Sequence, residues 1–126
     1  MRRTWGMIAA VILITVVCFG VTARAGLKVG TGKVEITPEL GCYLGGYYIA
    51  SDTAKSVHDP LYARVIALNQ GGKTVVLVQL DLVIMSGVMG TEIKDQVKER
   101  LGIPPEDVSI TVIHTHTGPE GYYPEF

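Results

Sequence analysis

The residues best suited to chemistry are two histidines near the end of the chain, His114 and His116, in the run IHTHTGP at 113–119. They follow an apolar segment, 108–113, that has the composition of a β-strand. Side chains alternate along a strand, so both histidines would point the same way if the chain stays extended. Neutral imidazole is the commonest metal ligand and the usual general base near neutral pH. The spacing alone leaves a chemical site and a chance pairing as equal alternatives.

A metal held by these histidines would be zinc. Nitrogen ligands combined with oxygen donors from elsewhere suit this ion, and a catalytic zinc keeps one position open for water. That water becomes acidic enough to attack a carbonyl carbon. The chain stops ten residues after His116, so the remaining ligands would have to come from other sequence.

A carboxylate is expected at the same edge of the sheet. Segments 74–80 and 108–113 enclose a helical pattern over 87–101, which predicts a βαβ unit with parallel strands. Asp81 follows the first strand as His114 follows the second, and ligands bind beyond the carboxyl ends of such strands. Asp81 could therefore accept a hydrogen bond from a metal-binding histidine and fix its tautomer. Capping of the following helical region and simple solvation are the alternatives.

Three other reactive side chains have plainer interpretations. His58, in the turn-like VHDP, is expected to be an exposed or capping turn residue. Arg64 alternates with the apolar residues of its strand, which is compatible with an outward, solvated position. Cys42 is expected to be a small packed residue, because no cation adjoins it to activate the thiol.

The elements that would position these residues indicate an α/β fold with a mixed sheet. Loose alternation over 26–37 indicates a strand, interrupted near its internal glycines. Segments 61–69 and 74–80, joined by QGGK, predict an antiparallel β-hairpin. The second is apolar nearly throughout, which predicts burial on both faces. The glycine- and tyrosine-rich stretch 41–50 predicts a surface loop, with the lining of an apolar pocket as the alternative.

Residues 1–25 predict a secretory signal peptide. A basic start, an apolar run over 5–21 and an Ala-Arg-Ala cleavage site at 23–25 give it that anatomy, with an uncleaved membrane anchor as the alternative. Without this segment, Lys plus Arg falls from 11 to 8 against 12 acidic residues, a net charge of −4. This balance argues against nucleic-acid binding. We expect an exported protein, periplasmic or secreted, whose folded part is 26–126.

Four stretches taken together resemble the neutral/alkaline, non-lysosomal ceramidase family. They are VGTGKVEITPELG, VHDPLYARVIAL, VVLVQLDL and IPPEDVSITVIHTHTGPEGY, in that family's order and spacing across residues 28–122. The last is the most specific, because HTHTGPEG is close to the family signature THTHSGPGG. Thr117 and Glu120 stand where Ser and Gly are usual, and Glu120 places a charge near the expected pocket.

The resemblance implies a zinc-dependent amidase that hydrolyses the N-acyl bond of ceramide to a sphingoid base and a fatty acid. His114 corresponds to a Zn²⁺ ligand and His116 to a catalytic pocket residue near the substrate. The family's other ligands (a His, a Glu and a Tyr) and its proposed serine nucleophile lie in later sequence. We therefore expect 26–126 to be the N-terminal fragment of a larger α/β catalytic domain, inactive and marginally stable alone. Membrane contact would be transient, through the signal segment or the lipid-like substrate, and the oligomeric state stays open.

Two other functions remain as alternatives. One is an amidohydrolase-like metal hydrolase with another substrate, in which both histidines are ligands on the first strand of a barrel. This alternative is disfavoured because the pair follows at least three predicted strands and a helix. The other is a non-enzymatic, exported binding or envelope domain whose histidines are incidental.

Overall fold

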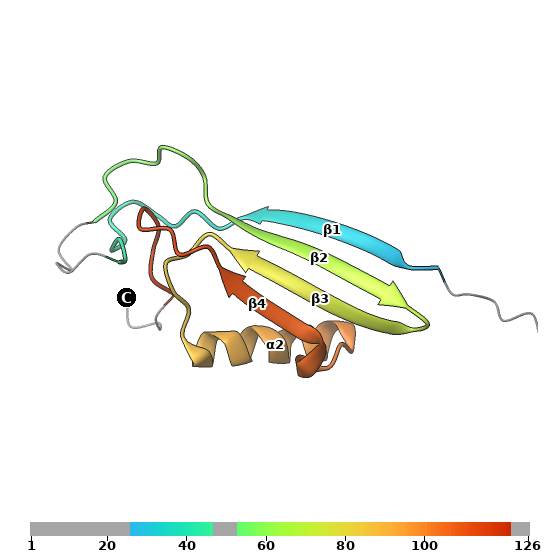
Figure 1. The fold of residues 1–126 in the computed structure, drawn as a ribbon. Helices are drawn as coiled ribbons and strands as arrows, with labels where there is room; N and C mark the ends of the chain where they lie inside the picture. The colour runs from blue at the N-terminus through green and yellow to red at the C-terminus, as the bar shows by residue number, and fades with distance from the viewer. Residues whose placement is uncertain (1–25, 47–52, 122–126) are drawn as a thin grey trace, which may run out of the picture.

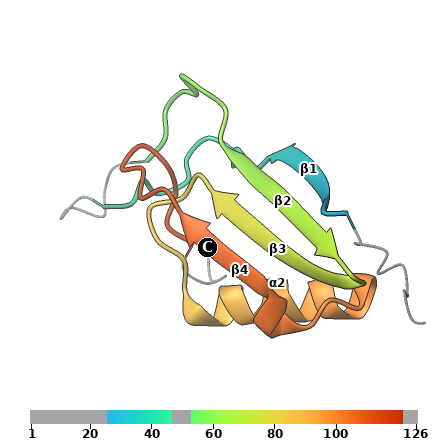
Figure 2. The same ribbon diagram turned by 45° about the vertical axis from the view of Figure 1, so that its right-hand side comes forward.

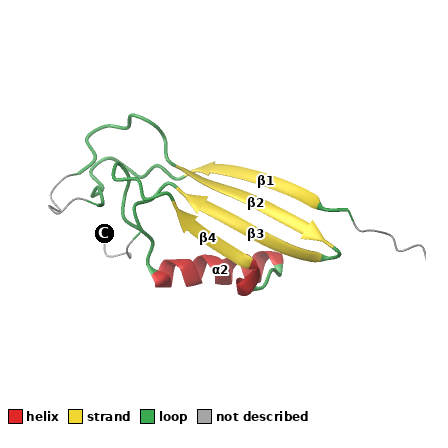
Figure 3. Cartoon of the chain, viewed as in Figure 1, coloured by secondary structure: helices red, strands yellow, loops and turns green. Residues whose placement is uncertain are grey.

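The fold is a four-stranded mixed sheet with one helix packed against it, seen in a computed structural model that describes residues 26–46 and 53–121 (Figures 1 and 3). The strands lie side by side in chain order: β1 (Lys28–Glu35), β2 (Tyr62–Gln70), β3 (Lys73–Leu80) and β4 (Val108–Val112). The helix is α2 (Gly87–Leu101), and a single 3₁₀ turn, η1 (Pro105–Asp107), precedes β4. The predicted α/β class with a mixed sheet is confirmed. The predicted signal segment and the last part of loop 41–50 lie outside the described residues.

The β2–β3 hairpin forms as predicted, and its glycine pair explains why. Gln70 pairs with Lys73, so Gly71 and Gly72 make a two-residue turn. Their φ angles are 61° and 85°, and a type I′ turn requires positive φ at both central positions. Glycine adopts such angles without steric cost, and this turn matches the twist of the paired strands.

The βαβ unit is also confirmed, because β3 and β4 pair in parallel and α2 connects them. The side chain of Ser86 caps the start of α2 by accepting a hydrogen bond from the Met89 amide at 3.2 Å. Gly102 ends the helix in the left-handed conformation, with its amide donating to the Lys98 carbonyl at 2.9 Å. Both devices satisfy backbone groups that a helix end leaves without partners. None of the helices in the described ranges has the length and apolar character needed to cross a membrane.

The hydrophobic core lies between α2 and one face of the sheet. Its buried members come from β2, β3, β4 and the loop after β3: Ala63, Val76, Val78, Leu80, Leu82 and Val108. Met89, Ile93 and Val97 of α2 pack against them from below. These helix residues recur every four positions and therefore share one side of the helix. The helix thus runs along β3 and β4 (Figure 2).

The prediction that strand 74–80 is buried on both faces is wrong for the described residues. Val76 is 5% exposed on the helix side, whereas Leu77 is 43% exposed on the other side. Ile66, which pairs with Leu77 from β2, is also 43% exposed. The reason is that α2 covers a single face, so alternate side chains of the same apolar strand point away from the core. We call this the open face of the sheet.

Strand β1 is continuous, so the predicted interruption near its glycines is wrong. Gly30 and Gly32 pair with Ala67 and Val65 of β2 in an unbroken register of eight residues. Backbone hydrogen bonds carry this pairing and need no side chain. Every residue of β1 is exposed, because the strand forms one edge of the sheet beyond the reach of α2.

Candidate functional site

The loops that follow β3 and β4 run together beyond the carboxyl ends of these two strands (Figure 1). The Thr115 amide donates to the Leu82 carbonyl at 3.3 Å, and the Val83 amide donates to the Pro119 carbonyl at 3.2 Å. Backbone pairing therefore continues past the last regular strand residues. This arrangement brings the segment with the two histidines onto the segment that follows β3, as the βαβ prediction required.

His114 is held in an unusual backbone conformation by a hydrogen bond of its ring. Its φ is 61°, the only positive value among the non-glycine residues that the structure describes. Its Nδ1 lies 2.7 Å from the Val83 carbonyl oxygen. A carbonyl oxygen can only accept, so Nδ1 carries the hydrogen and Nε2 keeps its lone pair. A non-glycine residue whose backbone is held in the left-handed region costs roughly 1–3 kcal/mol, and such residues concentrate at functional sites.

His116 approaches His114 closely, although not for the predicted reason. The chain does not stay extended, because β4 ends at Val112 and His114 turns it. The rings nevertheless converge, with centroids 4.9 Å apart in an edge-to-face arrangement and the two Nε2 atoms 3.3 Å apart. Since Nε2 of His114 accepts, Nε2 of His116 donates to it. The same separation would suit two ligands of one tetrahedral zinc, which lie about 3.3 Å apart when each bond is ~2.0–2.1 Å.

Asp81 supports the site from below, through contacts other than those predicted. Its carboxylate accepts from the Tyr62 amide at 2.9 Å and from Arg64 Nη1 at 2.5 Å, and its own amide donates to the Tyr62 carbonyl at 3.0 Å. The predicted hydrogen bond from a metal-binding histidine is therefore replaced by the Val83 carbonyl on His114. Helix capping and simple solvation are also wrong, because Asp81 is buried and Ser86 caps α2.

The pKa of the Asp81 carboxyl lies below its ordinary value. Burial alone raises this pKa, because it disfavours the charged form. The hydrogen bonds from Arg64 and the Tyr62 amide, and the positive charges of Arg64 and Lys33, lower it by more than burial raises it. Asp81 is therefore an ionised structural anchor of the loop that carries Val83.

Arg64 points away from the core, as predicted, but it is not simply solvated. Its side chain is 42% exposed, and its guanidinium pairs with Asp81 on the open face of the sheet. The sequence did not indicate this ion pair, because Asp81 follows the end of β3 and is 17 positions away from Arg64. His58 behaves as predicted: its side chain is 97% exposed in a turn, where Nδ1 contacts Asp59 at 2.7 Å.

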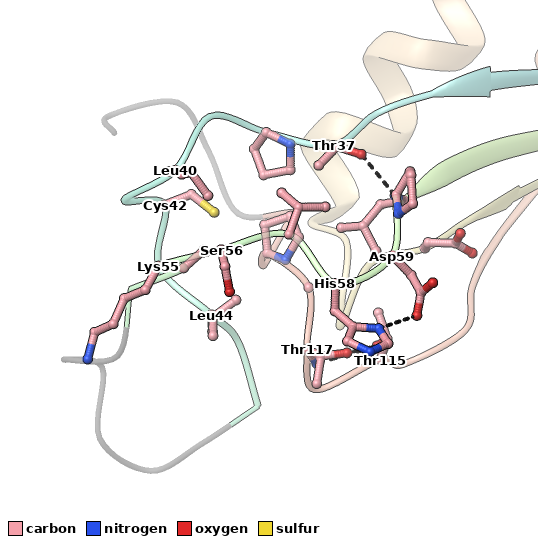
Figure 4. A pocket seen from close by; sticks show the side chains of 18 of the residues that line it. Thr37, Leu40, Cys42, Leu44, Lys55, Ser56, His58, Asp59, Thr115 and Thr117 are labelled. Atoms are coloured by element: carbon pink, nitrogen blue, oxygen red, sulfur yellow. Dashed lines mark hydrogen bonds and ion pairs between the residues drawn. The ribbon is translucent and has the colours of Figure 1, made fainter.

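A cavity of about 760 Å³ opens on the other side of the turn that carries the histidines (Figure 4). Thr115 and Thr117 line it, whereas the rings of the two histidines do not. Cys42 and Leu44 contribute from the glycine- and tyrosine-rich loop. The pocket-lining alternative for that loop therefore holds for these two residues, and Cys42 is half-buried there.

The sequence interpretation missed the role of Gly45 and Gly46. A Cβ at Gly46 would lie 2.7–2.9 Å from three ring atoms of His116, and a Cβ at Gly45 would lie 2.2 Å from Cγ of Glu120. The Gly46 amide donates to Glu120 Oε1 at 3.3 Å. The sequence did contain a signal for this close packing. Gly45 and Gly46 are adjacent, and no turn between two predicted strands accounts for the pair.

The two histidines do not by themselves make a complete metal site in the part of the chain that the structure describes. In ranges 26–46 and 53–121, no group of three or more His, Cys, Asp and Glu side chains could hold a metal ion. Structural zinc takes four ligands and catalytic zinc takes three protein ligands. The donor set of His114 and His116 suits zinc chemically, and at least one further ligand would have to join it.

Comparisons with known proteins agree on one family. The sequence profile described as "Neutral/alkaline non-lysosomal ceramidase, N-terminal" matches residues 27–126. Neutral ceramidase 1 of Arabidopsis thaliana is 33% identical over 107 residues, which are 82% of this chain and 14% of that protein. Neutral ceramidase of Oryza sativa subsp. japonica is 32% identical over 125 residues, 95% of this chain and 16% of that protein.

A solved structure shows the same fold. The crystal structure of neutral ceramidase from Pseudomonas aeruginosa superposes with a TM-score of 0.70 and 25% identity, covering 78% of this chain and 16% of that one. The chain thus spans about a seventh of the length of the relatives that it matches. The barrel expected of an amidohydrolase-like enzyme does not hold, because β1 and β4 are edges of an open sheet in the described part and the profile match is to another family.

Proposed function

This chain belongs to the neutral/alkaline non-lysosomal ceramidase family, and on that premise we propose that it supplies the amino-terminal part of a zinc-dependent amidase. The substrate is ceramide, whose N-acyl bond is hydrolysed to a sphingoid base and a fatty acid. The relatives that carry the name neutral ceramidase support this reaction. The described residues hold only part of the site, so the isolated chain is expected to be inactive.

The observation that carries the proposal is the ring of His114. Its Nδ1–H donates to the Val83 carbonyl at 2.7 Å, which leaves Nε2 as the only nitrogen able to bind a metal. Metal-binding histidines almost always donate their other ring N–H in this manner, because the bond fixes the tautomer and the ring orientation. A zinc ion bound there would polarise the amide carbonyl and acidify a bound water.

The other residues of the chain position this ligand and handle protons. His116, with Nε2 3.3 Å from Nε2 of His114, stands where a neutral imidazole can donate or accept a proton next to the reacting amide. Asp81 and Arg64 hold the beginning of the loop that presents the Val83 carbonyl. The alternative of a non-enzymatic binding domain needs none of these contacts.

We also propose that residues 1–25 direct the protein to export and are then removed. The basic start, the apolar run and the Ala-Arg-Ala sequence support this proposal. Amino-terminal sequencing of the protein recovered from the periplasm or medium tests it. Sequence beginning at Gly26 is the expected result, and an intact Met1 in the membrane fraction supports the anchor instead.

A chimera tests the enzymatic proposal directly. Residues 27–121 replace the matching region of Pseudomonas aeruginosa neutral ceramidase, and hydrolysis of a fluorescent ceramide and zinc content are measured. We expect turnover in the chimera, and we expect His114→Gln to abolish it while removing zinc. His116→Gln should lower turnover by about 10²–10⁴-fold with zinc retained, as for a group that transfers protons.

The matched control is His58→Gln, which removes the third histidine at an exposed turn. It should leave turnover and zinc content unchanged. A chimera that binds zinc and hydrolyses ceramide equally well with His114→Gln would refute the assignment. If the chimera binds zinc through His114 but leaves ceramide intact, the metal assignment stands and the substrate proposal fails.

A further inference from the structure

Gly46 lies against the face of the His116 imidazole. An ideal Cβ built on Gly46 would be 2.7 Å from Nδ1, 2.8 Å from Cγ and 2.9 Å from Cδ2 of that ring. Three adjacent ring atoms at nearly equal distances mean that the backbone of Gly46 covers the ring face rather than its edge. Real Cβ atoms essentially never come within 3.0 Å of other atoms, so only glycine fits without displacing the ring.

Glu120 contacts both glycines of this pair, Gly45 and Gly46. Its Oε1 accepts a hydrogen bond from the Gly46 amide at 3.3 Å. Its Cγ lies so close to Gly45 that a Cβ on that glycine would clash with it. The Gly45 amide also donates to the Gly118 carbonyl at 3.0 Å. The two glycines are therefore joined by backbone and side chain to the same turn that carries His116.

We propose that Gly46 is a positioning residue that sets the orientation of the His116 ring, and that Glu120 keeps it in contact. This inference rests on the proposed function, in which Nε2 of His116 must point towards the metal-binding Nε2 of His114. A methyl group on Gly46 would push the ring away and separate the two nitrogens.

The test uses Gly46→Ala with Gly41→Ala as the matched control. Both glycines have positive φ, 85° and 94°, so alanine is strained at either position, but nothing lies within 4 Å of a Cβ at Gly41. NMR of the 126-residue chain measures nuclear Overhauser effects between Gly46 Hα and the ring protons of His116. Titration with Co²⁺ measures the paramagnetic broadening of both histidine rings.

We expect the contact in the wild type and in the Gly41 variant, and its loss in Gly46→Ala. In Gly46→Ala, Co²⁺ should broaden the His116 ring protons less relative to those of His114, because the displaced ring lies farther from an ion bound at His114. Glu120→Ala should show a smaller decrease, and Glu120→Gln should keep the wild-type broadening because its amide oxygen still accepts from Gly46.

The inference is overturned if the contact is missing in the wild type, if both glycine variants reduce the broadening of the His116 ring equally, or if Gly46→Ala changes neither measurement. Far-UV circular dichroism shows whether each variant is folded, and the two Glu120 variants decide the matter if Gly46→Ala unfolds. An intact Gly46–His116 contact without any Co²⁺ effect at either histidine would refute the metal proposal while leaving the contact itself in place.

Discussion

Replacing Asp81 with Asn tests the anchor beneath the site most sharply. The carboxylate lies 2.5 Å from Arg64 Nη1 and 2.9 Å from the Tyr62 amide, and the residue is 5% exposed. Asn keeps an oxygen that can accept from Tyr62 but loses the charge that pairs with Arg64. The substitution therefore isolates the ion pair from the backbone hydrogen bond.

The expected loss of stability follows from the exposure of both partners. Breaking a buried ion pair costs about 3–5 kcal/mol, and a hydrogen bond to a charged group is worth about 1.5–3 kcal/mol. Arg64 is 42% exposed and can turn to water, so solvent screening brings the cost of Asp81→Asn down to about 1–2 kcal/mol. Asp81→Ala also leaves the Tyr62 amide without its acceptor, which raises the cost to about 2–4 kcal/mol.

Urea unfolding followed by circular dichroism, in the cold and with sucrose to support the folded baseline, measures these differences. A double-mutant cycle with Arg64→Met should give a coupling energy of about 1 kcal/mol. The pair Lys73 and Asp107, which lies far along the sheet, provides a control cycle. A coupling energy within about 0.3 kcal/mol of zero for Asp81 and Arg64 would refute the anchor.

The pH dependence gives an independent check with a definite sign. The folded-state pKa of Asp81 is lowered, so its contribution to stability is present above its unfolded pKa of about 4. That contribution disappears as the pH falls through the folded pKa. The difference between wild type and Asp81→Asn should therefore be full at neutral pH and shrink in acid below about pH 4. A difference that grows in acid would contradict this assignment.

Three further outcomes are expected. Ser86→Ala removes the cap of α2 and should lower the free energy of unfolding by about 1 kcal/mol, measured by thermal melting. Leu77→Lys should reduce binding of the dye ANS and self-association with little loss of stability, whereas Val76→Lys on the buried face should unfold the chain; equal effects would contradict the one-sided core. Lys73→Ala breaks the 3.0 Å contact with Asp107, and urea titration should show less than about 1 kcal/mol because the lysine is well exposed.

Features set by neighbouring residues were predictable from the sequence. The hairpin turn followed from Gly71 and Gly72, which supply both positive φ angles. The bounds of α2 followed from the helical pattern over 87–101, and Gly102 closes the helix directly after it. The parallel pairing of β3 and β4 followed from the helical segment between them, because parallel neighbours need a long crossover. The first two signals lie within a few residues of the structure they specify, and the third is the helical pattern of the segment that connects the two strands.

Features set by distant residues were not predictable. Arg64 and Asp81 are 17 positions apart and meet only because the register places Ala63 opposite Leu80. The partner of His114 is a backbone carbonyl, that of Val83, which no side-chain pattern reports. The apolar sequence of β3 could not reveal which of its faces α2 would cover.

The open face of the sheet exposes apolar side chains, and the consequence depends on how long they stay in water. In a relative where 107 matched residues are 14% of the chain, about 650 residues lie elsewhere. Synthesis proceeds at about 5–20 residues per second, so most of that length takes roughly half a minute to two minutes to appear. If such a length follows this chain, the hairpin, which forms within about 1–10 μs, holds Ile66 and Leu77 in water throughout that interval. Exposed apolar surface of this kind promotes association between partly made chains, so the time spent in that state matters as well as the stability of the finished fold.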